Sequence, residues 1–279
     1  MVKGSVVVAI PVYKSFSALT RSEMRSLAQC FSILGKRTIC IVGPGNLDFQ
    51  EYLEFADSNN ISLQIKTFKN SYFKSIAGYN KLLISKKFYE RFSSWDYILI
   101  YQLDAWVFSD QLDFWIEQGY DFIGAPLFEG FHKGNSINFV KGLNGGLSLR
   151  SIQTSIRLIK RIEELRGLLF IIKLFSFFAI RTLKPFFFLF HFKEKYYVKS
   201  FEKLHAAITF RNLNEDYYWS RLLEEAFVDY KVPTSLIALK FSFELNSAYL
   251  YALNDMHLPF GCHAWEKYDP RFWQRFIRI

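Results

Sequence analysis

The sequence predicts a single α/β domain with a mostly parallel central sheet flanked by helices. Three observations support this expectation. The chain has 279 residues, of which 51% are apolar, enough for a large core. Val6–Ile10 is a β-branched run without polar alternation, as in strands buried on both faces. Such runs then alternate with segments whose apolar residues recur every three or four positions, the order of β-α-β units.

The first half of the chain keeps this alternation regular. Pro11 closes the first run, and Gly43-Pro44-Gly45 closes the second. The expected strands are Val6–Ile10, Arg37–Val42, Leu63–Phe68 and Tyr97–Leu103, and the expected helices are Phe16–Leu34, Phe49–Ala56 and Ile76–Phe92.

The second half is less regular, and it contains neither an internal repeat nor a clear linker. We expect a short strand in Asp121–Pro126, a glycine turn entering a strand in Leu143–Arg150, helices at Ile152–Leu165 and Glu215–Phe227, and a strand at Leu239–Glu244.

Leu168–Phe192 is rich in phenylalanine and almost long enough to span a bilayer, which takes about 20 apolar residues. Lys173, Arg181 and Lys184 interrupt it and Pro185 breaks it, so a spanning helix is disfavoured. Two alternatives have equal weight: an amphipathic helix at a membrane surface, and a pair of buried helices or an oligomer contact.

The net charge of +9 is compatible with nucleic acid, anionic lipid or phosphorylated substrates as partners. The basic residues form no recognised nucleic-acid motif, so we expect no nucleic-acid partner. Three scattered cysteines indicate neither a zinc ribbon nor a disulfide framework, which favours a reducing compartment. The N-terminal apolar run is too short for a signal peptide. We expect a cytoplasmic protein, or one on the cytosolic face of the inner membrane.

Asp104 follows the most strand-like segment of the chain. Ligands of open α/β sheets bind at the carboxyl ends of the strands, and Mg²⁺ prefers carboxylate and phosphate oxygens. By itself, however, an aspartate here is more often a turn or helix-capping residue.

Three further groups have two interpretations each. Glu215 and Asp216 follow Asn214 at the start of an expected helix. They are either acids that the helix dipole stabilises, or one of them is a general base. His263 follows Gly261-Cys262 and is either a structural residue or a ligand of metal or phosphate. The segment Asn144-Gly145-Gly146 is a turn, or a backbone that runs close to a substrate.

The order of these groups resembles that of GT-A fold glycosyltransferases. The residues of the motifs resemble even more closely those of a little-characterised family of GT-A-like domains in bacteria and some eukaryotes, often encoded among polysaccharide genes. The resemblance covers about residues 5 to 268, except roughly 155 to 210. The matching segments are Ala77-Gly78-Tyr79-Asn80-Lys81-Leu82-Leu83, Tyr101-Gln102-Leu103-Asp104-Ala105, Asp121-Phe122-Ile123-Gly124-Ala125-Pro126, Asn144-Gly145-Gly146-Leu147-Ser148-Leu149-Arg150, Asn214-Glu215-Asp216 and Pro259-Phe260-Gly261-Cys262-His263-Ala264-Trp265.

The resemblance implies a role for each matching residue. Asp104 would bind the metal, His263 would bind the metal or the diphosphate, and Asp216, or in second place Glu215, would be the base of an inverting enzyme. The donor nucleotide would lie at Pro11, Val12, Tyr13, Asn80, Lys81, Gln102 and Asp104, and the acceptor and donor sugar beside Asn144, Gly145 and Gly146.

One departure affects the cofactor. The Asp-x-Asp motif of the fold is here Gln102-Leu103-Asp104, with one carboxylate. Asp104 and His263 with two phosphate oxygens would still hold Mn²⁺ or Mg²⁺. The alternative is weak or absent metal binding, with basic residues neutralising the diphosphate.

The resemblance therefore implies one GT-A-like domain, residues 1–279, with a nucleotide-binding half (1–110) and an acceptor and catalytic half (111–279). Residues 166–210 are expected to be a hydrophobic, basic helical insertion, for which contact with a membrane surface is one of the two alternatives given above. The expected reaction transfers a hexose from a nucleotide-sugar, UDP-sugar favoured, to a glycan or lipid-linked acceptor in surface polysaccharide biosynthesis. The alternatives are a nucleotidyltransferase on the same fold, whose Gly-rich basic loop is missing after the first strand, and a non-catalytic membrane-surface module.

Overall fold

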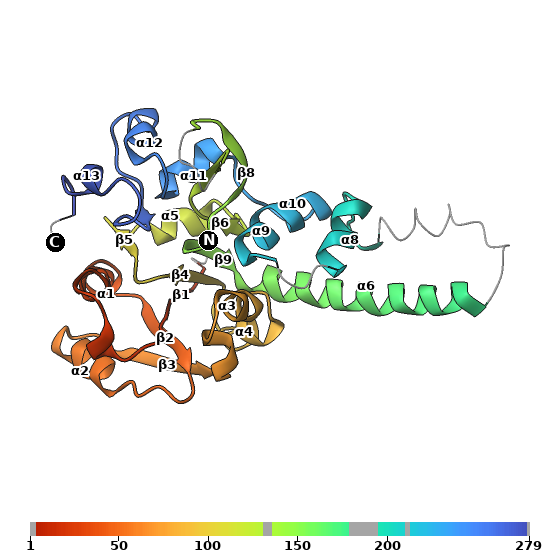
Figure 1. Ribbon diagram of the computed structural model, residues 1–279, viewed down its shortest axis with the longest axis horizontal. Helices are drawn as coiled ribbons and strands as arrows, with labels where there is room; N and C mark the ends of the chain where they lie inside the picture. Colours follow the sequence, from red (N-terminus) through yellow and green to blue (C-terminus); the bar gives the residue numbers. More distant parts are fainter. Residues whose placement is uncertain (1–3, 131–135, 179–194, 210–212, 278–279) are drawn as a thin grey trace.

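The computed structural model describes residues 4–130, 136–178, 195–209 and 213–277, with side chains described up to 167 in the second range. Its centre is a six-stranded sheet in the order β3-β2-β1-β4-β9-β6 (Figure 1). The strands are β1 (Val6–Pro11), β2 (Thr38–Pro44), β3 (Leu63–Phe68), β4 (Tyr97–Tyr101), β6 (Phe122–Ile123) and β9 (Leu147–Ser151). The first four run parallel, and β9 is antiparallel to its neighbours β4 and β6. The predicted α/β class with a mainly parallel sheet is confirmed.

Burial on both faces explains why the strand runs lack alternation. Val7 and Ala9 of β1 belong to one core cluster, while Val6, Val8 and Ile10 belong to another on the opposite face. Helices α1 (Arg21–Leu34) and α2 (Gln50–Ser58) cover the second face, and α3 (Ile76–Leu83), α4 (Lys86–Glu90) and α6 (Ile152–Phe178) cover the first. Both faces of the strand therefore need apolar residues.

Three helices of the first half, α1, α3 and α4, start at side-chain caps. Thr20 and Glu23 form a reciprocal capping box, so α1 begins after Thr20, and the expected single helix from Phe16 is a 3₁₀ turn followed by α1. Ser85 caps α4, which divides the expected helix Ile76–Phe92 in two. The elements are η1 (Phe16–Ala18), α1 (Arg21–Leu34), α2 (Gln50–Ser58), η2 (Asn70–Phe73), α3 (Ile76–Leu83) and α4 (Lys86–Glu90).

The second half adds a three-stranded sheet in the order β10-β11-β5 and a hairpin of β7 and β8. The strand prediction for Leu239–Glu244 was largely wrong. The segment begins inside a helix, α11, whose C-terminal half buries Ala238, Leu239 and Phe241. Only Ser242–Phe243 is a strand. The elements are β5 (Ala105–Val107), α5 (Leu112–Glu117), β7 (Pro126–Phe128), β8 (Phe139–Leu143), α11 (Ser235–Phe241), β10 (Ser242–Phe243), α12 (Ser247–Leu253), β11 (Gly261–His263) and α13 (Pro270–Trp273).

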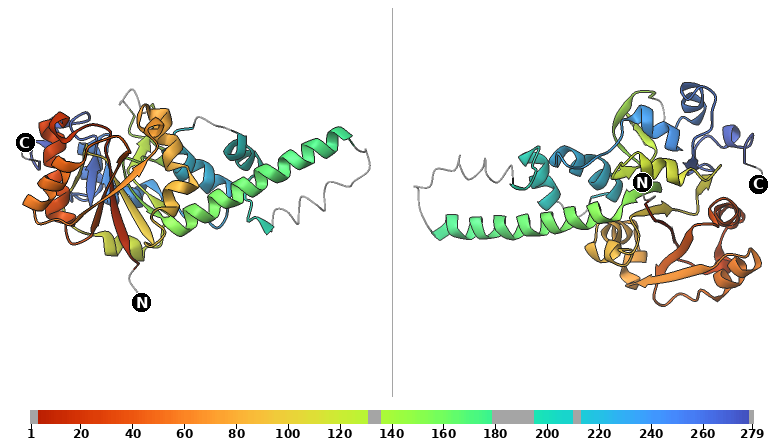
Figure 2. Two further views of the ribbon diagram at one scale, coloured as in Figure 1. Left: turned by 90° about the horizontal axis from the view of Figure 1, so that it is seen from below. Right: turned by 180° about the vertical axis from the view of Figure 1, so that it is seen from behind.

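The helix expected at Ile152–Leu165 continues as α6 (Ile152–Phe178), which projects from the body beside α8 (Phe201–Thr209) (Figures 1 and 2). Residues 179–194 of the phenylalanine-rich segment lie outside the described residues, and so do the side chains of 168–178. Within the described part of the chain, no helix is both long and apolar enough to cross a membrane.

The strand order reverses at β1. The chain proceeds from β1 to β2 and β3 on one side and then returns to β4 on the other. Open α/β sheets bind ligands at the carboxyl ends of the strands beside such a reversal. Pro11 and Tyr101, which end β1 and β4, therefore mark the place for a site.

Two glycines should respond oppositely to alanine. A Cβ on Gly124 would lie 1.9 Å from the Asn144 carbonyl oxygen, so Gly124→Ala should destabilise the fold by about 1–3 kcal/mol. A Cβ on Gly167, inside α6, would meet nothing within 4 Å, so Gly167→Ala should stabilise by up to about 1 kcal/mol. Urea unfolding measures both. Equal effects of the two substitutions would contradict the packing at Gly124.

Candidate active site

A cleft of about 830 Å³ opens at the carboxyl ends of β1 and β4. Of the site residues predicted from the sequence, it is lined by Pro11, Val12, Tyr13, Asn80, Gln102, Asp104, Asn144, Gly145, Gly146, Glu215, Asp216 and His263. Lys81 lies apart from them in an adjoining pocket of about 270 Å³, which shares Asn80 with the cleft. Residues more than 250 positions apart in the chain thus meet at the reversal of strand order.

Strand pairing brings Asp104 and His263 together. The Ala105 N–H donates to the Gln102 carbonyl at 2.8 Å, which closes a turn between β4 and β5 with Asp104 at its tip. Strand β5 pairs with β11, and His263 lies opposite Ala105. As a result, Asp104 Oδ1 is 3.1 Å from His263 Nε2, the carboxylate being half-exposed and the imidazole buried.

A second carboxylate faces the other side of the imidazole. Glu244 Oε1 lies 3.3 Å from His263 Nδ1. Burial alone would lower the pKa of His263, but the charges of Asp104 and Glu244 outweigh it and raise the pKa to about 10. In return, the imidazolium holds the pKa of Asp104 below its ordinary value although burial opposes this. The unliganded protein therefore carries a positive charge between two carboxylates.

Sequence reasoning missed Glu244. The signal that could have revealed it is its position at the end of a predicted strand, which is the argument that identified Asp104. The run was read as a strand through to Glu244, and no sequence pattern pairs its last residue with His263.

The donor atoms at Asp104 suit part of the coordination of a hard cation. Gln102 Oε1 is 3.2 Å from His263 Nε2, so three ligand atoms of Asp104, His263 and Gln102 lie together at the cleft. Octahedral Mg²⁺ with ligands at about 2.1 Å separates neighbouring ligand atoms by about 3 Å, close to these distances. Across the described residues, no cluster of three or more His, Cys, Asp or Glu side chains could hold a metal. A cation here would take its remaining ligands from phosphate and water.

The glycine pair is required by its neighbours in the protein. A Cβ on Gly146 would lie 2.0 Å from His263 Nε2, and a Cβ on Gly145 would lie 2.2 Å from Glu215 Oε1. Asn144 Oδ1 accepts the Gly146 N–H at 2.7 Å, which fixes the turn. Packing against Glu215 and His263 thus gives a reason for glycine at positions 145 and 146, in addition to the expected close approach of the backbone to a substrate.

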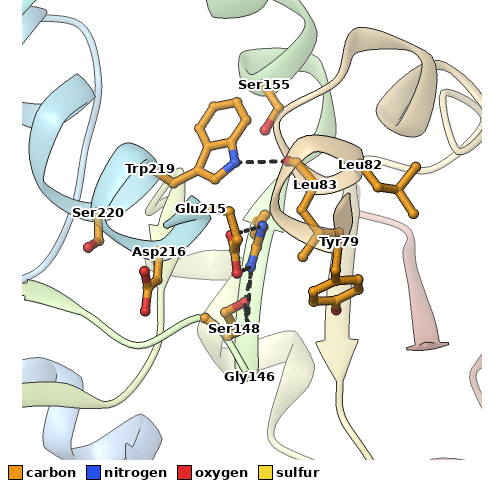
Figure 3. Close-up of polar contacts among 12 residues, drawn as sticks. Tyr79, Leu82, Leu83, Gly146, Ser148, Ser155, Glu215, Asp216, Trp219 and Ser220 are labelled. Carbon is orange, nitrogen blue, oxygen red and sulfur yellow. Dashed lines mark hydrogen bonds and ion pairs between the residues drawn. The ribbon is translucent and has the colours of Figure 1, made fainter. Parts of the chain in front are cut away.

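Glu215 and Asp216 have different surroundings. Glu215 is buried in a two-pronged ion pair with Arg150 of β9, at 2.7 and 3.0 Å. Burial raises the pKa of Glu215, while the carboxylate raises that of Arg150; because a guanidinium keeps its proton in proteins, the pair is ionic. Asp216 is only partly buried, and Figure 3 shows its side chain apart from that of Glu215.

Asp216 accepts the Tyr217 N–H at 2.7 Å, and burial raises its pKa above the ordinary value despite this bond and the charge of Arg150. A partly accessible carboxylate with a raised pKa is suited to accept a proton from a bound hydroxyl.

The helix that carries these acids is irregular. The expected helix Glu215–Phe227 consists of α9 (Glu215–Tyr217), a π-helical turn η3 (Tyr218–Leu222) and α10 (Leu223–Ala226). Trp219 Nε1 donates to the Leu83 carbonyl at 3.0 Å, as Figure 3 shows, and the Leu143 N–H donates to Ser220 Oγ at 2.8 Å. These bonds attach the turn to α3 and β8, and π-helical turns are frequent at functional sites.

Other cleft residues were not predicted from the sequence. Lys14, Lys74 and Lys267 supply positive charge, and Tyr79 and Tyr268 supply ring surface. Tyr79 accepts a hydrogen bond from Gln102 Nε2 at 3.4 Å. They come from separate segments without a shared motif, so only the fold assembles them.

The protein is therefore a mixed α/β protein with a cleft at the reversal of its strand order. Residues 62–263 match the family described as "Protein of unknown function (DUF5672)", and the chain belongs to that family.

A search of curated proteins finds no match. Similar solved structures include the mannosyltransferase PcManGT from Pyrobaculum calidifontis in complex with GDP-Man and Mn²⁺ (13% identity, TM-score 0.38, 56% of this chain and 47% of that one). Another is the glycosyltransferase GlyE of Streptococcus pneumoniae (14% identity, TM-score 0.45, 94% of this chain and 54% of that one). The chain spans about half the length of these structures. Likenesses of this size say nothing about activity.

The buried pair predicts a strong coupling. Arg150→Met or Glu215→Gln alone should destabilise the fold by about 3–5 kcal/mol, because each leaves an uncompensated buried charge or polar group. The double variant should lose much less than the sum of the two. Urea unfolding of all four proteins measures the coupling.

Lys86→Met serves as the control, since the Lys86–Glu90 pair is partly exposed to solvent and should contribute at most about 1 kcal/mol. Additive losses at positions 150 and 215 would show that the two residues do not act as a pair.

Proposed function

We propose that the protein is a glycosyltransferase that moves a sugar from a nucleotide-diphosphate donor to an acceptor hydroxyl. One observation carries the proposal: the Asp104–His263 pair and the partly buried Asp216 face the same cleft, at the strand reversal. A diphosphate leaving group and an acceptor proton need such a pair of sites side by side. The ordered motifs shared with GT-A enzymes give the same interpretation.

The donor would lie along the carboxyl ends of β1 and β4. Pro11, Val12 and the 65%-exposed ring of Tyr13 would take the base, and Asn80 the ribose or diphosphate. The diphosphate would lie against Asp104 and His263, with Gln102 beside them. A bound Mn²⁺ or Mg²⁺ would there neutralise charge that develops on the leaving group. Among nucleotides we favour UDP.

Asp216 would accept the proton of the acceptor hydroxyl as its oxygen attacks the anomeric carbon. The bond from that carbon to the diphosphate breaks, and the nucleoside diphosphate leaves with the electron pair, giving inversion. Glu215 would hold the start of α9, and with it Asp216, in place through its ion pair with Arg150. It is therefore the second choice for the base. Lys74 and Lys267 in the cleft would add positive charge near the leaving group.

The broader setting of the reaction follows from the same proposal. The acceptor would be a glycan or a lipid-linked saccharide in surface polysaccharide biosynthesis. The protein would act in the cytoplasm or on the cytosolic face of the inner membrane, and residues 168–192 would contact that surface. The division into a nucleotide-binding half and a catalytic half remains part of this proposal.

Donor turnover tests the proposal directly. Thermal-shift screening against UDP-, GDP-, dTDP- and CMP-sugars with Mn²⁺ should find a donor that raises Tm, since a ligand bound to the native state stabilises it. With that donor, Asp104→Asn and His263→Ala should each lower kcat/KM by at least about 100-fold. Asp216→Asn should lower kcat by about 100- to 10,000-fold while donor binding persists. Normal turnover by the Asp104 and His263 variants, or release of pyrophosphate in place of a nucleoside diphosphate, would refute this function.

The rate should also depend on pH through Asp216. The base works only when ionised, so kcat should rise with pH through the pKa of Asp216. Burial raises that pKa, and the acid limb should therefore lie above the range of an ordinary aspartate. Stopped assays across pH 4 to 8 with wild type and Asp216→Asn measure it. An identical limb in the residual activity of the variant would assign the titration to another group.

A further inference from the structure

Glu244 is a buried carboxylate that the proposed reaction does not yet use. Its relative exposure is 3%, and it lines the cleft beside His263. Among the described residues its Oε2 has no hydrogen-bond partner, and its Oε1 is 3.3 Å from His263 Nδ1. A buried charge without full compensation costs free energy, so stability alone does not account for a glutamate at this position.

The small sheet aligns three functional side chains in a row. In the parallel pair β10 and β11, Phe243 lies beside Cys262, so the next residues, Glu244 and His263, are also neighbours. On the opposite side of β11, His263 lies opposite Ala105, the residue after Asp104. Strand β11 therefore holds the imidazole between the two carboxylates.

Other contacts restrict the ring as well. Gly146 approaches its Nε2 edge so closely that a Cβ there would lie 2.0 Å away. Gln102 Oε1 is 3.2 Å from the same nitrogen. On the Nδ1 side, Glu244 is the group that the described residues place within ion-pair distance. Removing it would leave Nδ1 without a nearby anchor.

We propose that Glu244 is a positioning residue: its carboxylate fixes the His263 imidazole so that Nε2 faces the cleft beside Asp104, ready for a divalent cation or a diphosphate. A carboxylate on the far nitrogen of a metal-binding histidine orients the ring and increases its basicity. The contact between Nδ1 and Glu244 is an ion pair whose geometry falls short of a good hydrogen bond, and ligand binding would tighten it. This inference rests on the proposed function, because it concerns the same site.

Mn²⁺ binding without turnover tests the role of Glu244. Glu244→Gln keeps the shape and removes the charge, and electron paramagnetic resonance titration with Mn²⁺ should show affinity weakened by about 10- to 100-fold. Its Tm should fall, because one partner of a buried ion pair is removed. Glu244→Ala should weaken Mn²⁺ binding at least as much. An unchanged Mn²⁺ affinity in Glu244→Gln would overturn the proposal.

Asp269→Asn is a matched control in the same part of the chain. Asp269 Oδ2 accepts the Ser247 N–H at 2.6 Å at the start of α12 and does not line the cleft. This variant should lower Tm and leave Mn²⁺ affinity unchanged. If it weakens Mn²⁺ binding as much as Glu244→Gln does, then the effect reports general loosening and the positioning role is wrong.

A second probe separates this inference from the proposed metal. If wild type binds no Mn²⁺, with or without UDP or GDP, the cation part of the proposed function fails. The comparison then uses calorimetric binding of UDP and GDP alone. Equal weakening by Glu244→Gln and His263→Ala supports positioning of His263 for the diphosphate, and wild-type affinity in Glu244→Gln overturns it.

Discussion

The ion pair between Arg150 and Glu215 is the interaction on which the rest of the site depends. Arg150 belongs to β9 of the central sheet, and Glu215 is the first residue of α9 and lines the cleft. Arg150 also donates to the Gly145 carbonyl at 3.2 Å and lies over the ring of Phe122. One guanidinium therefore fixes the glycine turn, the acidic helix and the sheet relative to one another. The pair also constrains the position of Asp216, because Asp216 follows Glu215 in the chain.

The central sheet was the part of the fold that the sequence predicted best. Its strands are buried on both faces, and a continuous β-branched run is typical of strands in that environment. Boundaries were less accurate where local capping decides them, as at Thr20 and Ser85. At Leu239–Glu244 apolar and polar residues alternate as in a half-buried strand, but tertiary packing keeps the first half of the segment in α11 and leaves only Ser242–Phe243 as a strand.

The sequence predicted most residues of the candidate site but not the side chains with which they pair. Motif order singled out Asp104, Glu215, Asp216 and His263, which the fold brings to one cleft. The partners Arg150 and Glu244 depend on strand register, which lies in no local pattern. The same limit applies to Lys267 and Tyr268, which reach the cleft only because β11 inserts between β5 and β10.

The close approach of Gly146 to His263 has an evolutionary consequence. A side chain at position 146 and an imidazole at position 263 would occupy the same space, so the two positions cannot vary independently. A lineage that replaces His263 by a small residue releases position 146 from its need for glycine, whereas the reverse order of substitutions passes through a clash. Paired change at 146 and 263, with 263 changing first, is the historical trace that this contact should leave among relatives.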